Sequence, residues 1–453
     1  MKSKIHSVLK QALEDVKPNE EELRIIKSLT QGFLKILEAS KKKLKIDAEI
    51  FVGGSAAKGT IIKKDHYDID IFLRFHKKYP DENLSDLTER ILKVIPKKQK
   101  IHGSRDYFRV KTGKTIFFEI IPVKRIKNQK EAENVTDLSY FHVNYVKRKL
   151  KGKLLDEVRL AKAFCHANGC YGAESYIKGF SGYALELLIY NYGSFLKFIR
   201  AMEVIGQKAK PLATSSKRGQ NTATAKVKKG QGKIVIDIEK NYKNKNTILM
   251  DLNSAKLQSP IIVIDPTHKQ RNVLAALSDE TFEKFQKACM DFLKNPSIKA
   301  FENKGVNFEE IEKNAKKKKY EFILLEAITD RQEGDIAGSK LLKFYNHLAE
   351  EINKYFDVKK QEFEYNGEKT ARFAFAVKKK KEILLRGPKA DDKENLKRFK
   401  AKHKKIFIKN NRIYAKGATN MNLNAFIKNW EKKNGKRLKE MYVVNLTIAK
   451  LKF

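Results

Sequence analysis

Apolar residues recur with two different periods in the first third of the chain. Spacings of three and four residues over 1–45 predict two helices, the second of them capped by Asn19. Alternating or continuous apolar residues over 48–123 predict strands at AEIFVGG, YDIDIFLRF, YFRVKTG and KTIFFEIIPV, the last two joined as a hairpin. Residues 80–98 return to helical spacing. We therefore expect a domain of mixed strands and helices over 1–136.

Helical spacing dominates the next stretch, from 137 to about 200. DEVRLAKAFCHANG predicts a helix that begins at an acidic cap and ends at Asn168 and Gly169, and SGYALELLIYNYG predicts another between its serine and its final glycine. Residues 206–236 contain no acidic residue and few apolar ones, which predicts a flexible basic insertion. A strand at SPIIVIDP and a further helix follow, so 137–300 is expected to form a central helical domain.

The C-terminal part, 301–453, alternates strands and helices in the manner of a separate α/β unit. YEFILLEAIT predicts a strand, 335–355 a helix, and QEFEYNGEKTARFAFAV a hairpin through its Asn-Gly turn signal. A second helix is predicted at 391–405, a second hairpin at 406–416 and a last helix in NLNAFIKNWEKK. The order β-α-β-β-α-β, closed by the second hairpin, is that of a split-βαβ sandwich, an arrangement common in RNA binders.

The composition adds a large positive charge to this picture. The 453 residues include 96 Lys and Arg against 54 Asp and Glu, a formal net charge of +42. Part of this excess is lysine that serves solubility. The rest indicates a polyanionic partner such as nucleic acid, because neutralising phosphates releases their counterions. The lysines are spread along the whole chain rather than confined to one amphipathic helix, which disfavours a membrane surface.

Membrane, secretion and disulfide signals do not emerge from the sequence. No apolar run approaches the ~20 residues that are needed to cross a bilayer, and the N-terminal residues alternate charge with helical periodicity instead of forming a signal-peptide core. The three cysteines, Cys165, Cys170 and Cys289, have neither a disulfide framework nor zinc-ligand spacing. We therefore expect a cytoplasmic protein with no membrane partner.

Two aspartates interrupt the apolar run YDIDIFLRF. Asp68 and Asp70 are two residues apart, so their side chains leave the predicted strand on one face, roughly 6.5–7 Å apart at the backbone. Carboxylates this close repel each other unless a cation lies between them, and a hard dication such as Mg²⁺ takes oxygen ligands of this kind. Glu119, the only charge in the run IFFEIIPV, is the candidate third ligand from a neighbouring strand. Two such ions can activate an attacking hydroxyl and stabilise a leaving oxygen.

The segment before the aspartates has the composition of a phosphate-binding turn. GGSAAKGT, residues 53–60, follows a predicted strand, and its small residues let backbone N–H groups and the Ser55 hydroxyl approach phosphates closely. The spacing is not that of a Walker loop. A D-x-D pair alone is often a solvent-facing feature of an edge strand. Combined with the Gly-Ser turn before it and an isolated acid in a later strand, it becomes a much more specific pattern.

This pattern resembles the signature of the nucleotidyltransferase superfamily related to DNA polymerase beta, and within it the chain is similar to the archaeal, or class I, CCA-adding enzymes. The resemblance extends over nearly the whole chain. Its further segments are TDLSYFH, EVRLAKAFCHANGCYGAE, GFSGYALELLIYNYGSF, IDPTHKQRNVLAALS and RGP near the C-terminus. It implies an α+β multidomain fold with a polymerase-beta-like nucleotidyltransferase palm, a helical central domain and a C-terminal RNA-binding body and tail of βαββαβ type.

The resemblance also implies a reaction and the residues that perform it. Enzymes of this family add C, C and A to tRNA 3′ ends without a nucleic-acid template, from CTP and ATP, with release of pyrophosphate. Asp68, Asp70 and Glu119 would hold two Mg²⁺ ions. The residues implied to bind the nucleotide are Gly54, Ser55, Lys58, Ser139, His142, Lys162, Tyr171, Arg271 and Asn272.

The partner implied by the resemblance is tRNA, through its acceptor stem and 3′ end. Relatives of this kind are often homodimers. Contact with tRNA phosphates is assigned to the lysine run of the C-terminal part, which consists of Lys316, Lys317, Lys318 and Lys319.

Two positions depart from the family pattern, and two other functions stay open. Lys58 stands where the family usually has arginine, which keeps the charge but loses a bidentate phosphate contact. Glu119 stands where the family usually has aspartate and is one methylene longer. A poly(A) polymerase or another RNA terminal nucleotidyltransferase would carry the same acids. A non-catalytic RNA-binding protein could share the scaffold, although the presence of all three acids argues against it.

Overall fold

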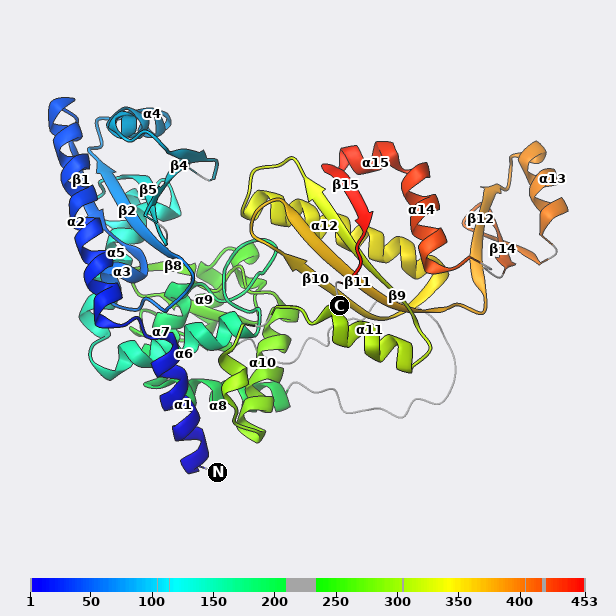
Figure 1. Ribbon diagram of the computed structural model, residues 1–453, viewed down its shortest axis with the longest axis horizontal. Helices are drawn as coiled ribbons and strands as arrows, with labels where there is room; N and C mark the ends of the chain where they lie inside the picture. Colours follow the sequence, from blue (N-terminus) through cyan, green and yellow to red (C-terminus); the bar gives the residue numbers. More distant parts are fainter. Residues whose placement is uncertain are drawn as a thin grey trace. The chain divides into compact units, whose positions relative to one another are not determined.

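The computed structural model describes residues 2–208 and 234–451, except 104, 114, 304, 404 and 418–420. The chain forms two compact units, Met1–Asn303 and Lys304–Phe453 (Figure 1). Most of the predicted basic insertion at 206–236 lies outside the described residues, and its two ends belong to a helix and a strand. No helix in the described part of the chain is long and apolar enough to cross a membrane.

The first unit begins with two helices and a five-stranded sheet. The elements are α1 (Lys2–Val16), α2 (Glu20–Lys43), β1 (Ala48–Val52), α3 (Gly54–Lys58), β2 (Tyr67–Phe75), α4 (Leu84–Ile91), β3 (Gln99–Ile101), β4 (Tyr107–Thr112) and β5 (Ile116–Lys124). The strand order is β1-β2-β5-β4-β3, with β2 parallel to β5 and the other neighbours antiparallel. The predicted helices, strands and β4–β5 hairpin are confirmed. Asn19 caps α2 in a reciprocal capping box with Glu22.

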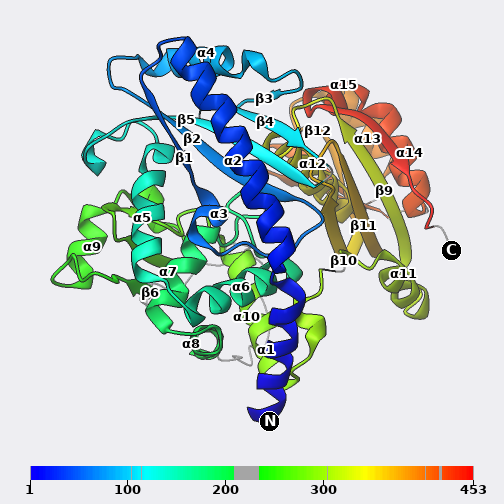
Figure 2. The same ribbon diagram turned by 60° about the vertical axis from the view of Figure 1, so that its left-hand side comes forward.

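Helix α2 crosses one face of this sheet (Figure 2). Phe33 of α2 stacks on Phe118 of β5 with ring centroids 4.3 Å apart, and Ile69 of β2 is buried in the same core. Because successive strand side chains point to opposite faces, the burial of these residues against α2 turns their neighbours Asp68 and Glu119 to the other face. The position of α2 therefore decides which face of the sheet is left for chemistry.

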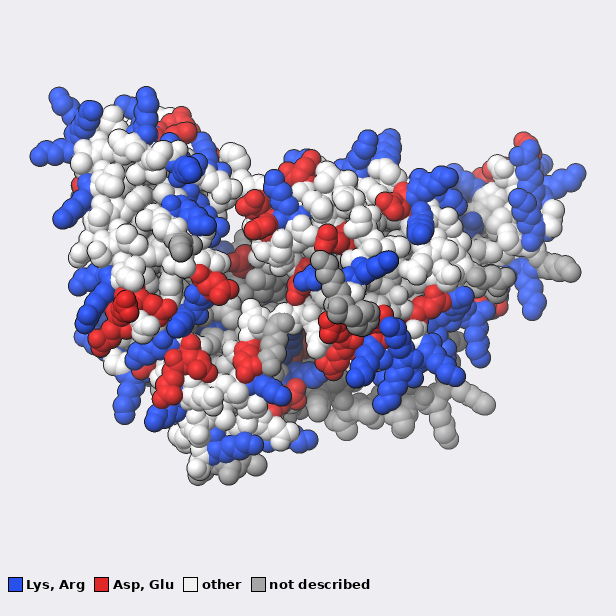
Figure 3. Space-filling model, in the orientation of Figure 1, with Lys and Arg blue, Asp and Glu red and all other residues white. Residues whose placement is uncertain are grey.

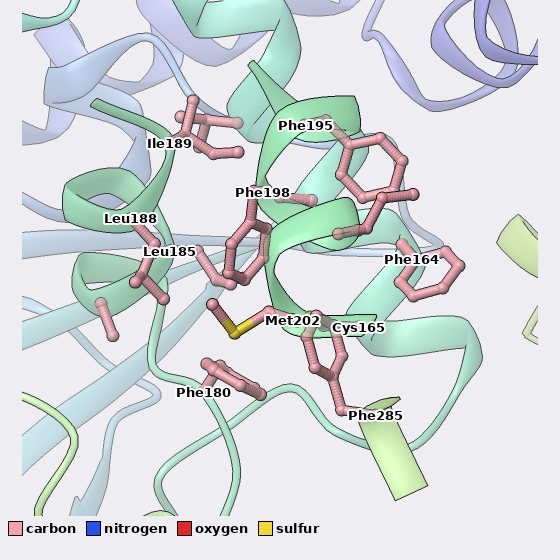
Figure 4. Packing of buried hydrophobic residues seen from close by; sticks show 14 of the residues in the cluster. Phe164, Cys165, Phe180, Leu185, Leu188, Ile189, Phe195, Phe198, Met202 and Phe285 are labelled. Carbon is pink, nitrogen blue, oxygen red and sulfur yellow. The ribbon is translucent and has the colours of Figure 1, made fainter. Parts of the chain in front are cut away.

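The remainder of the first unit is mostly helical. Its elements are α5 (Ser139–Lys149), α6 (Lys153–Ala167), α7 (Gly182–Tyr192), α8 (Phe195–Lys208), β6 (Ile234–Ile236), α9 (Lys245–Asp251), β7 (Ile261–Asp265), β8 (His268–Asn272) and α10 (Asp279–Lys294). Their core is rich in aromatic rings, and Phe285 contacts both Phe164 and Phe180 there (Figure 4). Helix α6 begins ahead of the acidic cap expected at Asp156, because Gly152, with φ of +55°, turns the chain into the helix.

The second unit contains two separate sheets. Its elements are α11 (Phe308–Lys317), β9 (Glu321–Thr329), α12 (Asp335–Tyr355), β10 (Phe356–Tyr365), β11 (Thr370–Lys379), β12 (Ile383–Lys389), α13 (Lys393–Lys402), β13 (Ile406–Lys409), β14 (Arg412–Gly417), α14 (Leu423–Lys433), α15 (Gly435–Glu440) and β15 (Val443–Ile448). The larger sheet has the antiparallel order β10-β11-β9-β15, and the smaller one the order β12-β14-β13. Helices α12 and α14 cover one face of the larger sheet and α11 the other.

The βαββαβ order of the second unit is present, but it is assembled from different segments than the sequence predicted. The helix at 391–405 and the hairpin at 406–416 were expected to close the sandwich, whereas α13, β13 and β14 form the smaller sheet together with β12. The closing elements are α14 and β15. Strand β15 is missing from the prediction because its pattern of buried and exposed residues does not alternate strictly.

Candidate active site

Three carboxylates lie on one face of adjacent parallel strands. In the pairing of β2 with β5, Asp70 lies directly opposite Glu119. Asp68 lies two residues before Asp70 on β2, so its side chain is on the same face. The residues between them on both strands are buried, while the three acids are only partly buried. Asp68 and Glu119 keep 36% and 24% of their side-chain surface exposed, so this face is open to solvent and solutes.

A single arginine lies among these acids. Arg109 of β4 is the register partner of Glu119, and its Nη2 donates to the Asp68 Oδ1 at 2.8 Å while its Nε is 3.7 Å from the Glu119 Oε1. The guanidinium also lies over the ring of Phe117, 4.2 Å from its centroid. Its buried Nε has no hydrogen-bond partner among the described residues. Arg109 thus supplies part of the positive charge that the acids require, through a hydrogen bond to Asp68 and a longer contact with Glu119.

The electrostatics of the acids favour binding of a cation. Burial, followed by repulsion from Asp70 and Asp68, raises the pKa of Glu119 to about 8. Burial also raises the pKa of Asp70 to about 6, with Asp68 contributing and Lys58 opposing. Carboxylate oxygens are the ligands that Mg²⁺ prefers. In the described part of the chain, however, no three acidic, histidine or cysteine side chains yet converge on one metal position. The chemistry of these oxygen donors fits a divalent ion, with Arg109 as the cation that now lies beside them.

The turn before β2 presses directly against Asp70. Gly53 N–H donates to the Asp70 carbonyl at 2.8 Å, and Gly54 has φ of +54°. A Cβ atom on Gly54 would lie 1.6 Å from the Asp70 Oδ2, so only glycine fits there. Ser55 follows in the short helix α3, which the sequence analysis described as a turn. Gly54 is therefore in contact with Asp70, and Ser55 is the next residue along the chain.

Two lysines from different parts of the first unit meet on one buried carboxylate. Glu186 of α7 is fully buried, and its Oε2 accepts from the Lys58 Nζ at 2.6 Å. Its Oε1 accepts from the Lys162 Nζ at 3.2 Å and from the Thr60 hydroxyl at 2.9 Å. Burial opposes ionisation, but Lys58 and Lys162 hold the pKa of Glu186 below its ordinary value. Burial lowers the pKa of Lys162 to about 8, against the opposing effect of Glu186. The two lysines and Glu186 together carry one net positive charge.

A second cluster joins α5, α7 and the β7–β8 pair. The carboxylate of Asp265 is within hydrogen-bond distance of the His142 Nε2 at 3.0 Å, accepts from the Tyr183 hydroxyl at 3.0 Å and accepts from Arg271 at 2.7 Å. His142 stacks on Tyr183 with centroids 4.2 Å apart, and the Lys58 Nζ lies 5.8 Å from the same ring. The predicted residues His142 and Arg271 are thus brought together, and Tyr183 connects them to Lys58.

Tyr171 and Ser139 occupy the edges of these clusters. Tyr171 stacks on His166 at 3.9 Å, and burial raises the pKa of its hydroxyl. A Cβ atom on Gly182 would lie 2.9 Å from the Tyr171 hydroxyl and 3.7 Å from the Lys162 Nζ, so these two groups face the same small space. Ser139 opens α5 and is partly exposed.

The remaining predicted residues are Asn272 and the lysine run. The side chain of Asn272 is buried and its hydrogen-bonding capacity is used internally: its oxygen accepts from two backbone N–H groups, and its amide donates to the Lys256 carbonyl and the Ser259 hydroxyl. It holds β7 and β8 together. The lysine run 316–319 lies in the second unit, at the end of α11 and just beyond it, and all four residues are exposed.

Four residues of these clusters were missed by the sequence analysis. Glu186 in ALELLI and Asp265 in IIVID are isolated acids in apolar runs, the same signal that identified Glu119. Applying that signal to the whole chain would have found both. Arg109 and Tyr183 have no comparable signal, because an arginine in a half-exposed strand and a tyrosine in a helix are ordinary residues.

Comparison with known proteins gives consistent matches along the first unit. A nucleotidyltransferase domain family matches residues 34–151, and the family described as the second domain of tRNA nucleotidyltransferase matches residues 156–302. A CCA-adding enzyme from Methanocaldococcus jannaschii is 30% identical over 427 residues, which covers 91% of this chain and 87% of that protein. One from Nanoarchaeum equitans is 40% identical over 236 residues, so that match spans about half of each chain, 52%.

A more distant relative and a solved structure extend the comparison. A CCA-adding enzyme from Archaeoglobus fulgidus is 27% identical over 424 residues, 91% of this chain and 86% of that protein. A solved structure titled as a cytoplasmic RNA terminal U-transferase aligns with a TM-score of 0.46 and 13% identity, covering 67% of this chain and 98% of that chain.

Divalent ions should stabilise the protein more strongly as the pH rises. Protons compete with metal for Asp70 and Glu119, whose pKa values are about 6 and 8, so metal binding releases protons and tightens between pH 6 and 8. We expect the increase in melting temperature on adding Mg²⁺ to be larger at pH 8 than at pH 6. Glu119→Gln should remove most of this pH dependence. If Mg²⁺ raises the melting temperature of the unsubstituted protein equally at pH 6 and pH 8, the assignment of Asp70 and Glu119 as metal ligands is contradicted.

Removal of Arg109 should strengthen metal binding. Arg109→Gln deletes the charge that competes for Asp68 and Glu119, so we expect the affinity for Mn²⁺, measured by calorimetry, to rise about tenfold, equivalent to about 1.4 kcal/mol. Arg125→Gln is the matched control, because Arg125 lies six residues beyond Glu119, just past the end of β5, and pairs there with Asp47 and Glu49. Unchanged or weaker Mn²⁺ binding in Arg109→Gln would show that the guanidinium does not occupy the cation position.

Proposed function

The chain belongs to the family of CCA-adding enzymes, the tRNA nucleotidyltransferases, and we propose that it extends tRNA 3′ ends by C, C and A from CTP and ATP at the face formed by Asp68, Asp70 and Glu119. Membership of this family makes it a transferase of tRNA processing. One observation supports the location above all others, namely the register that sets Asp70 opposite Glu119 on parallel strands beside the Gly54 turn.

The proposed chemistry is transfer of a nucleotidyl group. The tRNA 3′-hydroxyl attacks the α-phosphate of the nucleotide, a new P–O bond forms, and the bond to the β-phosphate breaks to release pyrophosphate. Nucleotidyltransferases use divalent metal ions, and two bound Mg²⁺ ions would lower the pKa of the hydroxyl and stabilise the leaving pyrophosphate. The residues of this chain that would hold them are Asp68, Asp70 and Glu119. Glu119 would contribute from β5 and is one methylene longer than an aspartate.

The triphosphate is assigned to the space beside α3. Ser55 and Lys58 lie in α3, directly after the glycines that contact Asp70, and Lys162 of α6 meets Lys58 on Glu186. The two lysine side chains are almost completely buried, at 8% and 3% exposure, so their attraction for phosphate is little weakened by water. Glu186 pairs with both lysines and fixes their positions. We assign Glu186 as a positioning residue that acts through the two lysines.

The nucleoside end is assigned to the Asp265 cluster. Asp265 is within hydrogen-bond distance of both His142 and Arg271, and the ring of Tyr183 lies next to Lys58. The Tyr171 hydroxyl faces the same small space as Lys162, and Ser139 is the first residue of α5. Since the Asn272 amide has no hydrogen-bonding capacity left, we assign it to holding the β7–β8 pair, and Arg271 to the base.

The second unit and the basic surface are assigned to tRNA. Lys and Arg side chains are spread over the face of the molecule shown in Figure 3. A positive surface of this kind binds phosphates without sequence preference, which suits an enzyme that must accept many tRNAs. We propose that Lys316–Lys319 contribute to this contact, that 1–136, 137–300 and 301–453 act as palm, central and tRNA-binding domains, and that the enzyme works in the cytoplasm.

Loss of one carboxylate should abolish transfer and leave RNA binding intact. Asp70→Asn keeps the size of the side chain next to Gly54 but removes a metal ligand, so we expect incorporation of labelled CMP into a tRNA lacking CCA to fall at least a thousandfold. Affinity for the tRNA, measured by filter binding, should change less than about twofold, because phosphate contacts dominate it. Normal CMP incorporation by Asp70→Asn would refute the assignment.

The unsubstituted enzyme provides the control for the reaction itself. With CTP and ATP supplied separately and together, three ordered additions to a tRNA lacking CCA are expected. A long A-tail from ATP alone would indicate a poly(A) polymerase, and no Mg²⁺-dependent pyrophosphate release would indicate a non-catalytic RNA-binding protein.

Neutralising Glu186 should weaken nucleotide binding most at alkaline pH. Without this carboxylate the pKa of Lys162 falls below its present value of about 8, so above neutral pH the ammonium loses its proton and its attraction for phosphate. We expect Glu186→Gln to raise the KM for CTP about tenfold at pH 8, with a smaller change at pH 6.5 and in kcat. Glu239→Gln is the control, because that carboxylate bridges Lys149 and Tyr145 away from the site. A KM that is raised equally at both pH values would contradict a role through Lys162.

A further inference from the structure

A partly exposed aromatic ring lies beside the acids and takes no part in the core. Phe117 of β5 is the register partner of Asp68 and lies on the same face of the sheet as Glu119. Its neighbour Phe118 is fully buried and packs on α2. Among the described residues, Phe117 belongs to none of the buried apolar clusters. Its ring therefore contributes little to holding the domain together, although it adjoins the groups proposed to perform the reaction.

Three nitrogen-containing side chains surround this ring. The Arg109 guanidinium lies 4.2 Å from the ring centroid, and the ammonium group of Lys111, the register partner of Phe117 on β4, lies 5.6 Å from it. The His66 ring meets Phe117 edge to face, with centroids 5.5 Å apart. Lys111 is exposed, and so is about half of the His66 side chain, 49%. We call Phe117, Arg109, Lys111 and His66 the aromatic–basic platform.

An aromatic ring among positive charges suits single-stranded nucleic acid. Bases stack on aromatic rings and on guanidinium planes, while basic side chains attract the phosphates of the backbone. Stacking accepts any base, because every base has a π-face. The substrate of the proposed reaction ends in such a strand, and its last base changes as nucleotides are added. A stacking contact beside the acids could therefore hold the RNA end at successive steps.

The direction of the proposed reaction places the RNA end on this side of the acids. Lys58 and Lys162, which are assigned to the triphosphate, lie near Asp70 and offset part of the rise in its pKa. The platform adjoins Asp68 instead, on strands β5 and β4. In phosphoryl transfer the attacking and leaving oxygens lie roughly in line through the phosphorus. With pyrophosphate leaving on the side of the two lysines, the attacking hydroxyl arrives from the side of the platform.

We propose that the aromatic–basic platform binds the 3′-terminal nucleotide of the RNA, with its base stacked against Phe117 and Arg109 and its phosphate attracted by Lys111. This inference rests on the proposed function and names residues for the RNA end, which the acids and the two lysines leave unassigned. The positive charges of Arg109 and Lys111 offset part of the repulsion between that phosphate and the acids. Phe117 and Lys111 are positioning residues, because they act by holding the terminal hydroxyl beside Asp68.

Photocrosslinking of the full chain tests the location. The probe is a tRNA lacking CCA to which a single 3′-deoxy-5-iodocytidine has been added, so that its end cannot react further and its base crosslinks to a ring stacked on it. Without added nucleotide, we expect the crosslink at Phe117 or at its neighbour His66, and Phe117→Leu should lower the yield about tenfold. Phe51→Leu is the matched control, because Phe51 is also partly buried but lies on β1, on the other side of β2. Crosslinks confined to other segments, or an unchanged yield in Phe117→Leu, overturn the proposal.

Kinetics of the same variants test the stacking. Phe117→Leu keeps an apolar side chain but removes the ring, so we expect kcat for CMP incorporation to fall about tenfold, the loss of one base–aromatic stack. The KM for CTP should stay the same, and the affinity for tRNA in filter binding should change less than about twofold, because phosphate contacts elsewhere dominate it. Phe117→Tyr keeps the ring and should keep kcat. Equal losses in both variants, or no loss in Phe117→Leu, show that stacking on this ring does not position the RNA.

Two further measurements separate this role from a structural one. Mg²⁺ should raise the melting temperature of Phe117→Leu as much as that of the unsubstituted protein, and a lost increase would mean that the ring acts on the metal site instead. Lys111 is exposed, so Lys111→Gln leaves the fold intact and should lower the crosslink yield about threefold, whereas Lys35→Gln, exposed on α2, should not. An unchanged yield in Lys111→Gln counts against the phosphate contact. The crosslink forms without any transfer, so failure of the platform and failure of the proposed reaction are distinguished.

Discussion

The parallel register of β2 and β5 is the constraint on which the site depends. A strand turns every second residue to the same face, so burial of Ile69 and Phe118 against α2 commits Asp68, Asp70 and Glu119 to the other face. A slip of one residue in either strand would bury a carboxylate without a partner. The apolar core and the acidic face therefore enforce each other, and the same packing that stabilises the sheet aligns Asp70 with Glu119.

Charge balance explains the groups that surround the acids. Burial, followed by repulsion from the two neighbouring aspartates, raises the pKa of Glu119, and Arg109 supplies only a partial counter-charge. The neighbouring lysine cluster has the opposite charge. Lys58 and Lys162 would repel each other if Glu186 did not lie between them. The acids keep an excess of negative charge, and the lysine cluster keeps an excess of positive charge. A metal–triphosphate complex carries charges of both signs and would neutralise both clusters.

Individual residues show how far a sequence can be interpreted. Asn19, the β4–β5 hairpin, the two ends of α7 and helix α12 follow local signals, and all were predicted. The closing elements of the second unit were not, because β15 does not alternate strictly and the segment containing α13 has equally good local signals of its own. Glu186 and Asp265 could have been identified as isolated acids in apolar runs. Their partners could not, because a hydrogen bond between residues 128 positions apart has no local signature.

The sequence by itself determined the elements of the first unit, the face on which the acids lie and the sign of the partner's charge, since these depend on periodicity and composition. The tertiary structure alone decided which distant side chains neutralise one another. It brings Arg109 to Asp68, Glu186 to both lysines and Asp265 to His142 and Arg271. It also decided that Ile26, Phe33 and Leu37 of α2 are buried while Ile25, Leu29 and Ile36 are exposed. The physical reason is that electrostatic and packing partners are chosen by distance in space, which the chain sets only after its strands and helices have been assembled.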